Sequence, residues 1–239
     1  MSYQNTFQRY EIKYMISKAQ KERILSVIAP YMSIDKYGRT IIRNLYFDTD
    51  SYRLIRRSNE KPIYKEKLRI RSYALATPDS DVFVELKKKY KSVVYKRRLT
   101  LPEHAVMEAF SDGTPLPVSS QIGDEIAYFR EFYGPLTPKV YLSYAREAFY
   151  MLDGSDFRIT FDDEIQYRTS DLTLTKEPSG TPLLKDGLVL MEVKAPGALP
   201  LWLIKALTEE RIFKTTFSKY GTAYADILKT KVKGDAYHD

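Results

Sequence analysis

Charged side chains at two-residue spacing are the feature of this sequence that could do chemistry. Between Glu66 and Tyr73, the residues Lys67, Arg69 and Arg71 alternate with apolar ones. Successive side chains of a β-strand point to opposite faces, so residues at positions i, i+2 and i+4 share one face. The segment is therefore expected to form a strand with one cationic face and one apolar face.

Six further segments repeat this pattern. The charged or polar residues that share a face are Glu11 with Lys13; Glu85 with Lys87 and Lys89; Lys96 with Arg98; Tyr144 with Arg146; Arg158 with Thr160 and Asp162; and Glu192 with Lys194. For one strand alone, the usual explanation is a sheet with one face on a core and one in solvent. Solvated faces usually mix Ser, Thr, Asn and Gln with their charges, whereas Arg and Lys dominate here. The repetition favours a sheet that closes with its charged face inward, around a tunnel.

A tunnel lined by so many cations would repel itself unless it held an anion, because charges interact strongly in a confined site of low dielectric constant. A chain of phosphates supplies negative charge and acceptor oxygens, which Arg binds bidentately and Lys binds as a point charge. Four carboxylates among the cations are interpreted as ligands of a divalent metal or as groups that orient the cations: Glu11, Glu85, Asp162 and Glu192. Phosphoryl transfer needs positioning, charge neutralisation and a metal that bridges phosphate oxygens.

The composition narrows the classes of partner and cofactor. The 239-residue chain has a net charge of +7, which favours an anionic partner. It has no cysteine and only two histidines, His104 and His238, which excludes thiolate chemistry and argues against histidine acid–base catalysis. Any metal is expected to be Mn²⁺ or Mg²⁺, held by carboxylates. No apolar run approaches the roughly 18 residues of a membrane span, and Met1 to Gln8 lacks the apolar stretch of a signal peptide, so a cytoplasmic protein is expected.

Eight strands and five helices would position these residues. The strands are expected at Phe7–Met15, Thr40–Phe47, Glu66–Tyr73, Val82–Lys89, Val93–Leu99, Val140–Tyr150, Phe157–Gln166 and Leu188–Lys194. Capping-box spacings at Ser17/Gln20 and Thr100/Glu103 predict helices that end near Pro30 and Phe110, and further helices are expected at Ser120–Phe132, Leu201–Arg211 and Tyr220–Lys231. The expected fold is α+β: a closed, antiparallel, eight-stranded β-barrel with a charged interior, covered by a few helices. No linker divides the chain, so residues 1–239 are expected to form a single domain.

Twenty tyrosines beside basic residues raise the alternative of a nucleic-acid partner, because bases stack on aromatic rings. Tyr10, Tyr14 and Tyr95, however, fall on the apolar faces of their strands. Packing in a core explains them better, and no nucleic acid is expected as a partner.

Eight short motifs give the chain a resemblance to a known family. They are Tyr10-Glu-Ile-Lys-Tyr14, Leu45-Tyr-Phe-Asp48, Lys67-Leu-Arg-Ile-Arg71, Phe83-Val-Glu-Leu-Lys87, Tyr144-Ala-Arg146, Arg158-Ile-Thr-Phe-Asp162, Met191-Glu-Val-Lys194 and Phe217-Ser-Lys-Tyr220. In this order and over nearly the whole chain, they resemble the VTC domain, the polyphosphate polymerase module of the triphosphate tunnel metalloenzyme (CYTH-like) superfamily. Each motif alone is weak, since two charges two residues apart are common.

The resemblance implies the triphosphate tunnel fold and a role for each matched residue. Arg69 and Arg71 would hold the nucleotide phosphates beside Lys13 and Lys87, and Glu192 would coordinate the metal. The remaining phosphate path would be lined by Lys67, Lys96, Arg98, Tyr144, Arg146, Arg158, Lys194, Ser218 and Lys219. The resemblance also implies the reaction, in which the γ-phosphate of ATP passes to a growing inorganic polyphosphate chain that leaves through the tunnel.

Two departures from the superfamily pattern bear on function. Triphosphatases and cyclases of the superfamily usually begin with Glu-x-Glu-x-Lys, whereas Arg9 replaces the first Glu here. This favours a polymerase over the alternative of a tunnel triphosphatase that hydrolyses nucleoside triphosphate or tripolyphosphate. A further alternative is a catalytically silent anion-binding module for polyphosphate or nucleic acid. Eukaryotic polymerases of the family also carry membrane helices, which are absent here, so coupling to translocation would need a membrane partner.

Overall fold

The computed structural model describes residues 10–91 and 93–235, and two compact units emerge from its contacts. Unit 1 consists of Met1–Ile41, Tyr144–Ile165 and Leu184–Phe217, and unit 2 of Ile42–Ser143, Gln166–Leu183 and Ser218–Asp239. Strands β3 (Thr40–Asp48), β7 (Thr137–Met151) and β8 (Arg158–Arg168) contribute residues to both. Each unit is assembled from separated segments of the chain, so the division into units does not decide how many domains the chain forms. The single-domain organisation therefore stays a prediction. Arg9 lies outside the described residues.

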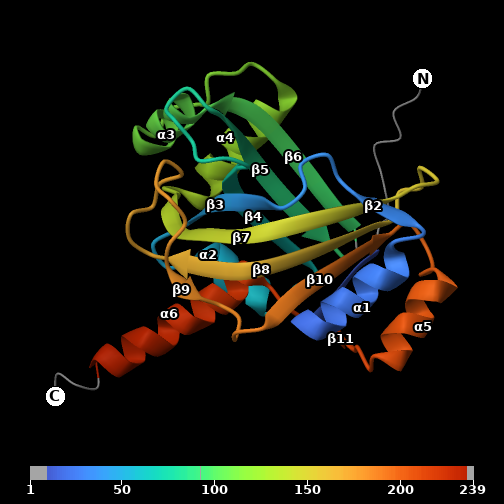
Figure 1. The fold of residues 1–239 in the computed structure, drawn as a ribbon. Helices are drawn as coiled ribbons and strands as arrows, with labels where there is room; N and C mark the ends of the chain where they lie inside the picture. Colours follow the sequence, from blue (N-terminus) through green and yellow to red (C-terminus); the bar gives the residue numbers. More distant parts are fainter. Residues whose placement is uncertain (1–9, 92, 236–239) are drawn as a thin grey trace. The chain divides into compact units, whose positions relative to one another are not determined.

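Unit 1 is an antiparallel sheet with two helices on its apolar face. Its elements are β1 (Tyr10–Ser17), α1 (Lys18–Ile28), β2 (Met32–Ile34), β10 (Leu188–Ala195), α5 (Leu201–Glu209) and β11 (Lys214–Thr215). The strand order is β11-β1-β10-β8, and β2 pairs with the end of β7. Ile24 of α1 and Leu203 of α5 pack in one core with Ile16, Phe161 and Met191 of the strands. Figure 1 shows α1 and α5 next to each other.

Unit 2 is a second run of antiparallel strands with its own helices. Its elements are β3 (Thr40–Asp48), α2 (Arg53–Asn59), β4 (Tyr64–Ser72), β5 (Asp81–Tyr90), β6 (Val93–Pro102), α3 (Glu103–Ser111), α4 (Gln121–Tyr133), β9 (Thr181–Pro182) and α6 (Lys219–Asp235). The order is β7-β3-β4-β5-β6, and β9 pairs with β8. Val106 of α3 and Ile126 of α4 pack against Leu68, Val84 and Leu86 of the sheet.

The alternation expected from the sequence is confirmed in both units. In β4, Leu68 and Ile70 are fully buried under the helices, whereas Lys67 and Arg69 lie on the opposite face and are half-buried. Tyr14 is buried as expected, but the expectation was wrong for Tyr10 and Tyr95, which are exposed. Tyr10 begins its strand, and Tyr95 lies on β6, the last strand of the sheet order.

The closed barrel is not confirmed. The strand order ends at β11 and at β6, and no pairing between described residues joins these two strands. The mainly antiparallel sheet with helices is confirmed, and three short strands, β2, β9 and β11, join the eight that were expected. None of the helices in the described ranges is long and apolar enough to cross a membrane.

The helix signals were partly right. Ser17 caps α1 as a capping box, since its Oγ accepts from the Gln20 N–H while Gln20 Oε1 accepts from the Ser17 N–H. The capping box at Thr100 was wrong: Thr100 lies in β6 opposite Phe83, and α3 begins at Glu103 without a side-chain cap. Sheet pairing therefore outweighs the local capping signal at this position.

Candidate functional site

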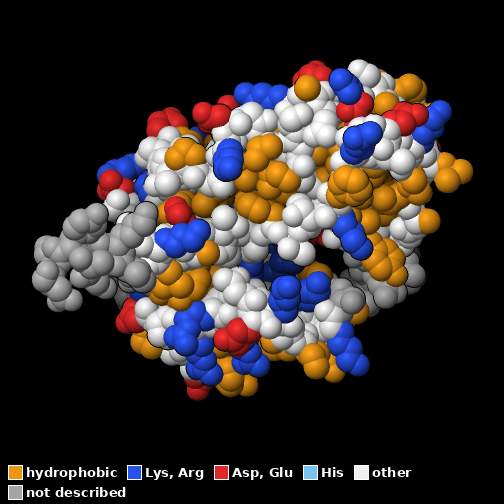
Figure 2. Space-filling model, turned by 90° about the horizontal axis from the view of Figure 1, so that it is seen from below, with side chains coloured by type: hydrophobic (Ala, Val, Ile, Leu, Met, Phe, Trp, Pro, Cys, Tyr) orange, Lys and Arg blue, Asp and Glu red, His pale blue; other side chains and the backbone are white. Residues whose placement is uncertain are grey.

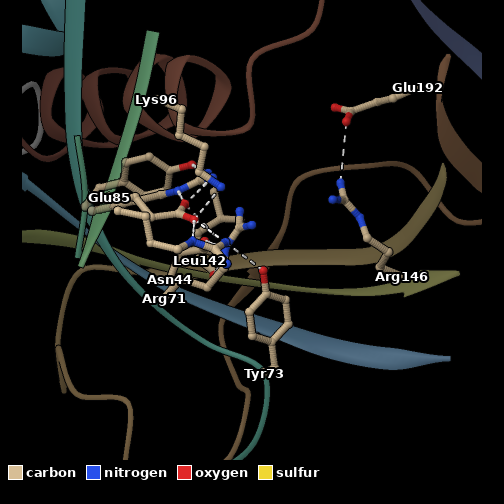
Figure 3. A network of polar contacts seen from close by, with 11 residues as sticks. Asn44, Arg71, Tyr73, Glu85, Lys96, Leu142, Arg146 and Glu192 are labelled. Carbon is tan, nitrogen blue, oxygen red and sulfur yellow. Dashed lines mark hydrogen bonds and ion pairs between the residues drawn. The ribbon is translucent and has the colours of Figure 1, made fainter. Parts of the chain in front are cut away.

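A cluster of cations surrounds the buried carboxylate of Glu85 on the charged face of unit 2 (Figure 3). The register places Arg69 of β4 and Arg98 of β6 on either side of Glu85 in β5. Glu85 accepts from Arg69 Nε at 2.8 Å, from Arg98 Nε at 2.8 Å and from Lys96 Nζ at 2.6 Å. Arg71 Nε lies 3.9 Å from the same carboxylate. Four cations thus meet one carboxylate, which leaves a local excess of positive charge.

Neutral side chains fix the arginines of this cluster. Arg71 Nε donates to Asn44 Oδ1 at 3.0 Å, and Asn44 in turn donates to the Leu142 carbonyl at 3.1 Å (Figure 3). Arg98 Nη2 donates to the Tyr73 hydroxyl at 3.0 Å. Guanidinium groups held in this way are preorganised to bind phosphate oxygens.

The protonation states follow from burial and from neighbouring charges. Burial raises the pKa of Glu85, but Arg69, Arg71 and Lys96 outweigh it and hold that pKa well below its usual range, so the carboxylate is ionised. Partial burial lowers the pKa of Lys96 to about 8; Glu85 opposes this shift, and Arg98 adds to it. The charge of Lys96 therefore changes close to neutral pH.

A second cluster lies in unit 1, around Glu192 of β10. Lys13 of β1 is its register partner, with Nζ 3.2 Å from Glu192 Oε1 and 3.3 Å from Glu11 Oε1. Arg146 holds Asp162 through two hydrogen bonds of 2.6 Å and lies 3.4 Å from Glu192, a contact drawn in Figure 3. Burial opposes the charge of Arg146, but Asp162 outweighs it and raises the pKa of Arg146.

The four carboxylates interpreted as metal ligands occupy different surroundings. Glu85 and Asp162 accept close hydrogen bonds from guanidinium groups, at 2.8 Å and 2.6 Å, whereas the guanidinium of Arg146 lies 3.4 Å from Glu192. The metal role of Glu85 and Asp162 stays a prediction. Glu11 and Glu192 both face Lys13, and one or two carboxylates completed by phosphate and water oxygens suit Mg²⁺ or Mn²⁺. The donor chemistry of Glu11 and Glu192 therefore fits a hard divalent cation. Among residues 10–91 and 93–235, no group of three or more His, Cys, Asp or Glu side chains could hold a metal.

The other cationic and hydroxyl residues expected in the site divide between the units. In unit 2, Lys67 Nζ donates to Ser218 Oγ at 3.1 Å, at the start of α6 next to Lys219, and Lys87 is the register partner of Lys67. In unit 1, the Arg146 guanidinium lies over the Tyr144 ring at 5.1 Å. Lys194 lies opposite both Glu11 and Arg158 in register, and Arg158 forms an ion pair with Asp156 at 3.4 Å.

The sequence interpretation gave no role to a polar row on β3. Asn44 supports Arg71, and the Tyr46 hydroxyl accepts from Arg69 at 3.1 Å. Asp48, fully buried, accepts from the backbone N–H groups of Leu54 and Ile55 at the start of α2 and from the Tyr220 hydroxyl. Asn44, Tyr46 and Asp48 have the same two-residue spacing as the charged rows, so that spacing could have revealed them.

The family model for the VTC domain matches residues 8–228. The chain belongs to the VTC domain family. The resemblance inferred from the eight motifs is therefore confirmed, and it covers nearly the whole chain. A search of curated proteins gave no match.

Solved structures match this VTC domain over most of its length. A candidate adenylate cyclase from Bacillus halodurans is 16% identical, with a TM-score of 0.56, and the match covers 90% of this chain and 95% of that one. A candidate adenylate cyclase from Vibrio parahaemolyticus is 11% identical, with a TM-score of 0.49 and coverage of 92% and 99%. The Mimivirus capping enzyme triphosphatase is 9% identical, with a TM-score of 0.36 and coverage of 85% and 89%. At 16% identity, the likeness to the Bacillus halodurans protein concerns the fold alone.

Proposed function

We propose that this VTC domain is a metal-dependent polyphosphate polymerase that transfers the γ-phosphate of ATP to a growing inorganic polyphosphate chain. The single observation that carries the proposal is the cluster of four cations around Glu85 in a chain of this family. An excess of fixed positive charge on a face with few competing anions suits a ligand whose negative charge is spread along its length. A cytoplasmic location, where ATP is available, belongs to the same proposal.

The chain's own residues would bind and orient the phosphates. Arg69, Arg71, Lys96 and Arg98 would bind oxygens of the triphosphate, and their fixed geometry favours in-line attack. A terminal oxygen of the polyphosphate chain attacks the γ-phosphorus, the bond from that phosphorus to the β–γ bridging oxygen breaks, and ADP leaves with the electron pair. The remaining predicted residues, which include Lys13, Lys87, Arg146, Arg158 and Lys194, would neutralise charge along the chain.

A divalent metal would be held by Glu192 and Glu11, whose carboxylates both face Lys13. When bound, it supplies charge neutralisation on phosphate oxygens. Lys13 would then exchange its carboxylate partners for phosphate.

The test is incubation of purified protein with ATP and Mn²⁺ or Mg²⁺, with ADP, orthophosphate and polymer resolved separately. Polymer from the wild type that is lost in Glu192→Gln and in Arg69→Ala/Arg71→Ala supports the proposal. A matched control is Arg97→Ala, since Arg97 lies on β6 but pairs with Glu125 on the opposite face. Orthophosphate without polymer would mean that the protein is a tunnel triphosphatase. Tight polyphosphate binding without turnover would mean that it is a binding module.

A further inference from the structure

Three consecutive rows of side chains cross β4, β5 and β6 on their charged face. The register gives the first row as Arg69, Glu85 and Arg98, the second as Lys67, Lys87 and Lys96, and the third as Lys65, Lys89 and Val94. Rows two residues apart are separated by about 7 Å along a strand, so the three rows span about 14 Å. We call Lys65 and Lys89 the outer lysine row.

The outer lysine row holds two like charges in direct opposition. Like charges that face each other across two strands are destabilising. Glu85 offsets the arginines of the first row, but no carboxylate is a register partner of Lys65 or Lys89. Both lysines are half-buried, and burial lowers the pKa of Lys65, as do Lys89, Lys87 and Lys61. The row therefore carries an electrostatic cost that an anion would remove.

The contacts of Lys65 leave it available for such an anion. Its Nζ reaches the Ser58 carbonyl at 3.4 Å, which is a long contact for a charged donor. In the described ranges, no ion pair involves Lys65 or Lys89. A neighbouring lysine shows the contrast, because Lys88 lies on the opposite face and pairs with Glu125 at 3.6 Å.

We propose that Lys65 and Lys89 form a subsite for a linear inorganic polyphosphate chain longer than a triphosphate. The subsite continues the face on which Arg69 and Arg98 hold Glu85, so a chain bound there could extend along all three rows. This inference rests on the proposed function, because it assigns the outer end of the same phosphate path. The aromatic residues next to the outer lysine row, Tyr90 and Tyr95, lie on the other face, which favours polyphosphate at this row over a single-stranded nucleic acid that stacks its bases.

The experiment compares the affinities for tripolyphosphate and for long-chain polyphosphate by calorimetry, in the absence of ATP. In Lys65→Ala/Lys89→Ala, the long chain is expected to bind about tenfold more weakly, while tripolyphosphate binds as it does to the wild type. Lys89→Glu is a second variant, since it pairs an opposite charge with Lys65 and should lose the long chain without loss of thermal stability. The control Lys88→Ala/Lys185→Ala removes as much charge elsewhere, since Lys88 lies on the opposite face and Lys185 is exposed between β9 and β10, and it should leave both affinities unchanged.

Each outcome decides the proposal. The subsite would be overturned if Lys65→Ala/Lys89→Ala bound both ligands more weakly by the same factor. It would also be overturned if the Lys88/Lys185 control lost as much affinity for the long chain. Equally tight binding of a single-stranded oligonucleotide would overturn the assignment to polyphosphate. If the variants lose affinity for the long chain alone but the wild type makes no polymer from ATP, the result would support the subsite and contradict the polymerase. If the wild type makes polymer but the variants bind the long chain as tightly as it does, the result would support the polymerase and contradict the subsite.

Discussion

Glu85 is fully buried, yet it is bonded to three cations that are partly accessible to solvent. A divalent metal at Glu85 would have to displace Arg69, Lys96 or Arg98 and would be repelled by the others. The geometry therefore favours the second of the two interpretations of the inward carboxylates, in which they orient cations. The same reasoning applies to Asp162, which Arg146 holds bidentately.

Glu85→Gln is expected to lower the free energy of unfolding by about 3 kcal/mol at neutral pH, because the cations lose their buried counter-charge. Since the folded-state pKa of Glu85 is depressed, its contribution is present above the unfolded pKa of about 4.3 and is lost as the pH falls towards the folded value. Urea denaturation at a series of pH values measures this, and the difference between variant and wild type should shrink on acidification. Glu125→Gln, which removes ion pairs that are partly exposed to solvent, is the control and should lower the free energy of unfolding much less.

The lysine at position 96 should make phosphate binding sensitive to pH. Because its pKa is lowered to about 8, it is charged below pH 8 and loses its charge above that value in the free protein. Tripolyphosphate affinity is therefore expected to fall between about pH 7 and 9. Lys96→Arg keeps the charge and should flatten the profile in a calorimetric titration; a decline of equal steepness in both proteins would assign the effect to another group.

At the scale of the elements, the alternation of charged and apolar residues was enough to predict which face of a strand such as β4 or β5 carries the charged side chains. Lys67, Arg69 and Glu85 lie on one face as expected, because a period of two is fixed by the backbone of any strand. The partners of these residues could not be predicted. Register and strand order depend on pairing between distant segments, such as β1 with β10.

Helix α2 was missed for a related reason. Its first turn is capped from outside, by Asp48 at the end of β3, and Tyr52 before it has a φ of 56°. No capping pattern within the helix or next to it predicts a capping side chain that lies six or seven residues upstream. Thr100 shows the reverse, since its local signal was present but pairing in β6 overrode it.

Asp48→Asn should show how much this buried cap contributes. One oxygen accepts from Thr49 and Leu54, and the other accepts from Ile55 and Tyr220. An amide would place an N–H against one of these pairs of donors, so the free energy of unfolding is expected to fall by about 2 kcal/mol. Thermal denaturation measures the effect. Asp50→Asn is the matched control, because Asp50 is exposed and pairs with Lys139 at 2.6 Å, and it should behave as the wild type does.

At the scale of the whole molecule, the net charge of +7 is spread over the surface as well as gathered in the clusters. Figure 2 shows Lys and Arg side chains recurring across one face, interspersed with hydrophobic ones. Charges of this kind attract anions over several ångströms and are screened by salt.

The affinity for long-chain polyphosphate is therefore expected to fall more steeply with salt concentration than the affinity for tripolyphosphate. A longer chain neutralises more fixed cations and releases more counterions when it binds, as in the binding of nucleic acids. Plots of log affinity against log salt concentration measure both slopes. Equal slopes for the two ligands would mean that a chain beyond a triphosphate makes no further ionic contacts.

The register of β1 with β10 also has a consequence for biosynthesis. Lys13 and Glu192 are partners across the sheet although 179 residues separate them in the chain. At roughly 5–20 residues per second, a ribosome needs roughly 10–40 s to make that stretch. During this interval the first strand has no partner in β10 and exposes edge groups that can pair with other chains. A chaperone that binds the emerging N-terminal strand would therefore protect the nascent protein when it is most prone to aggregate.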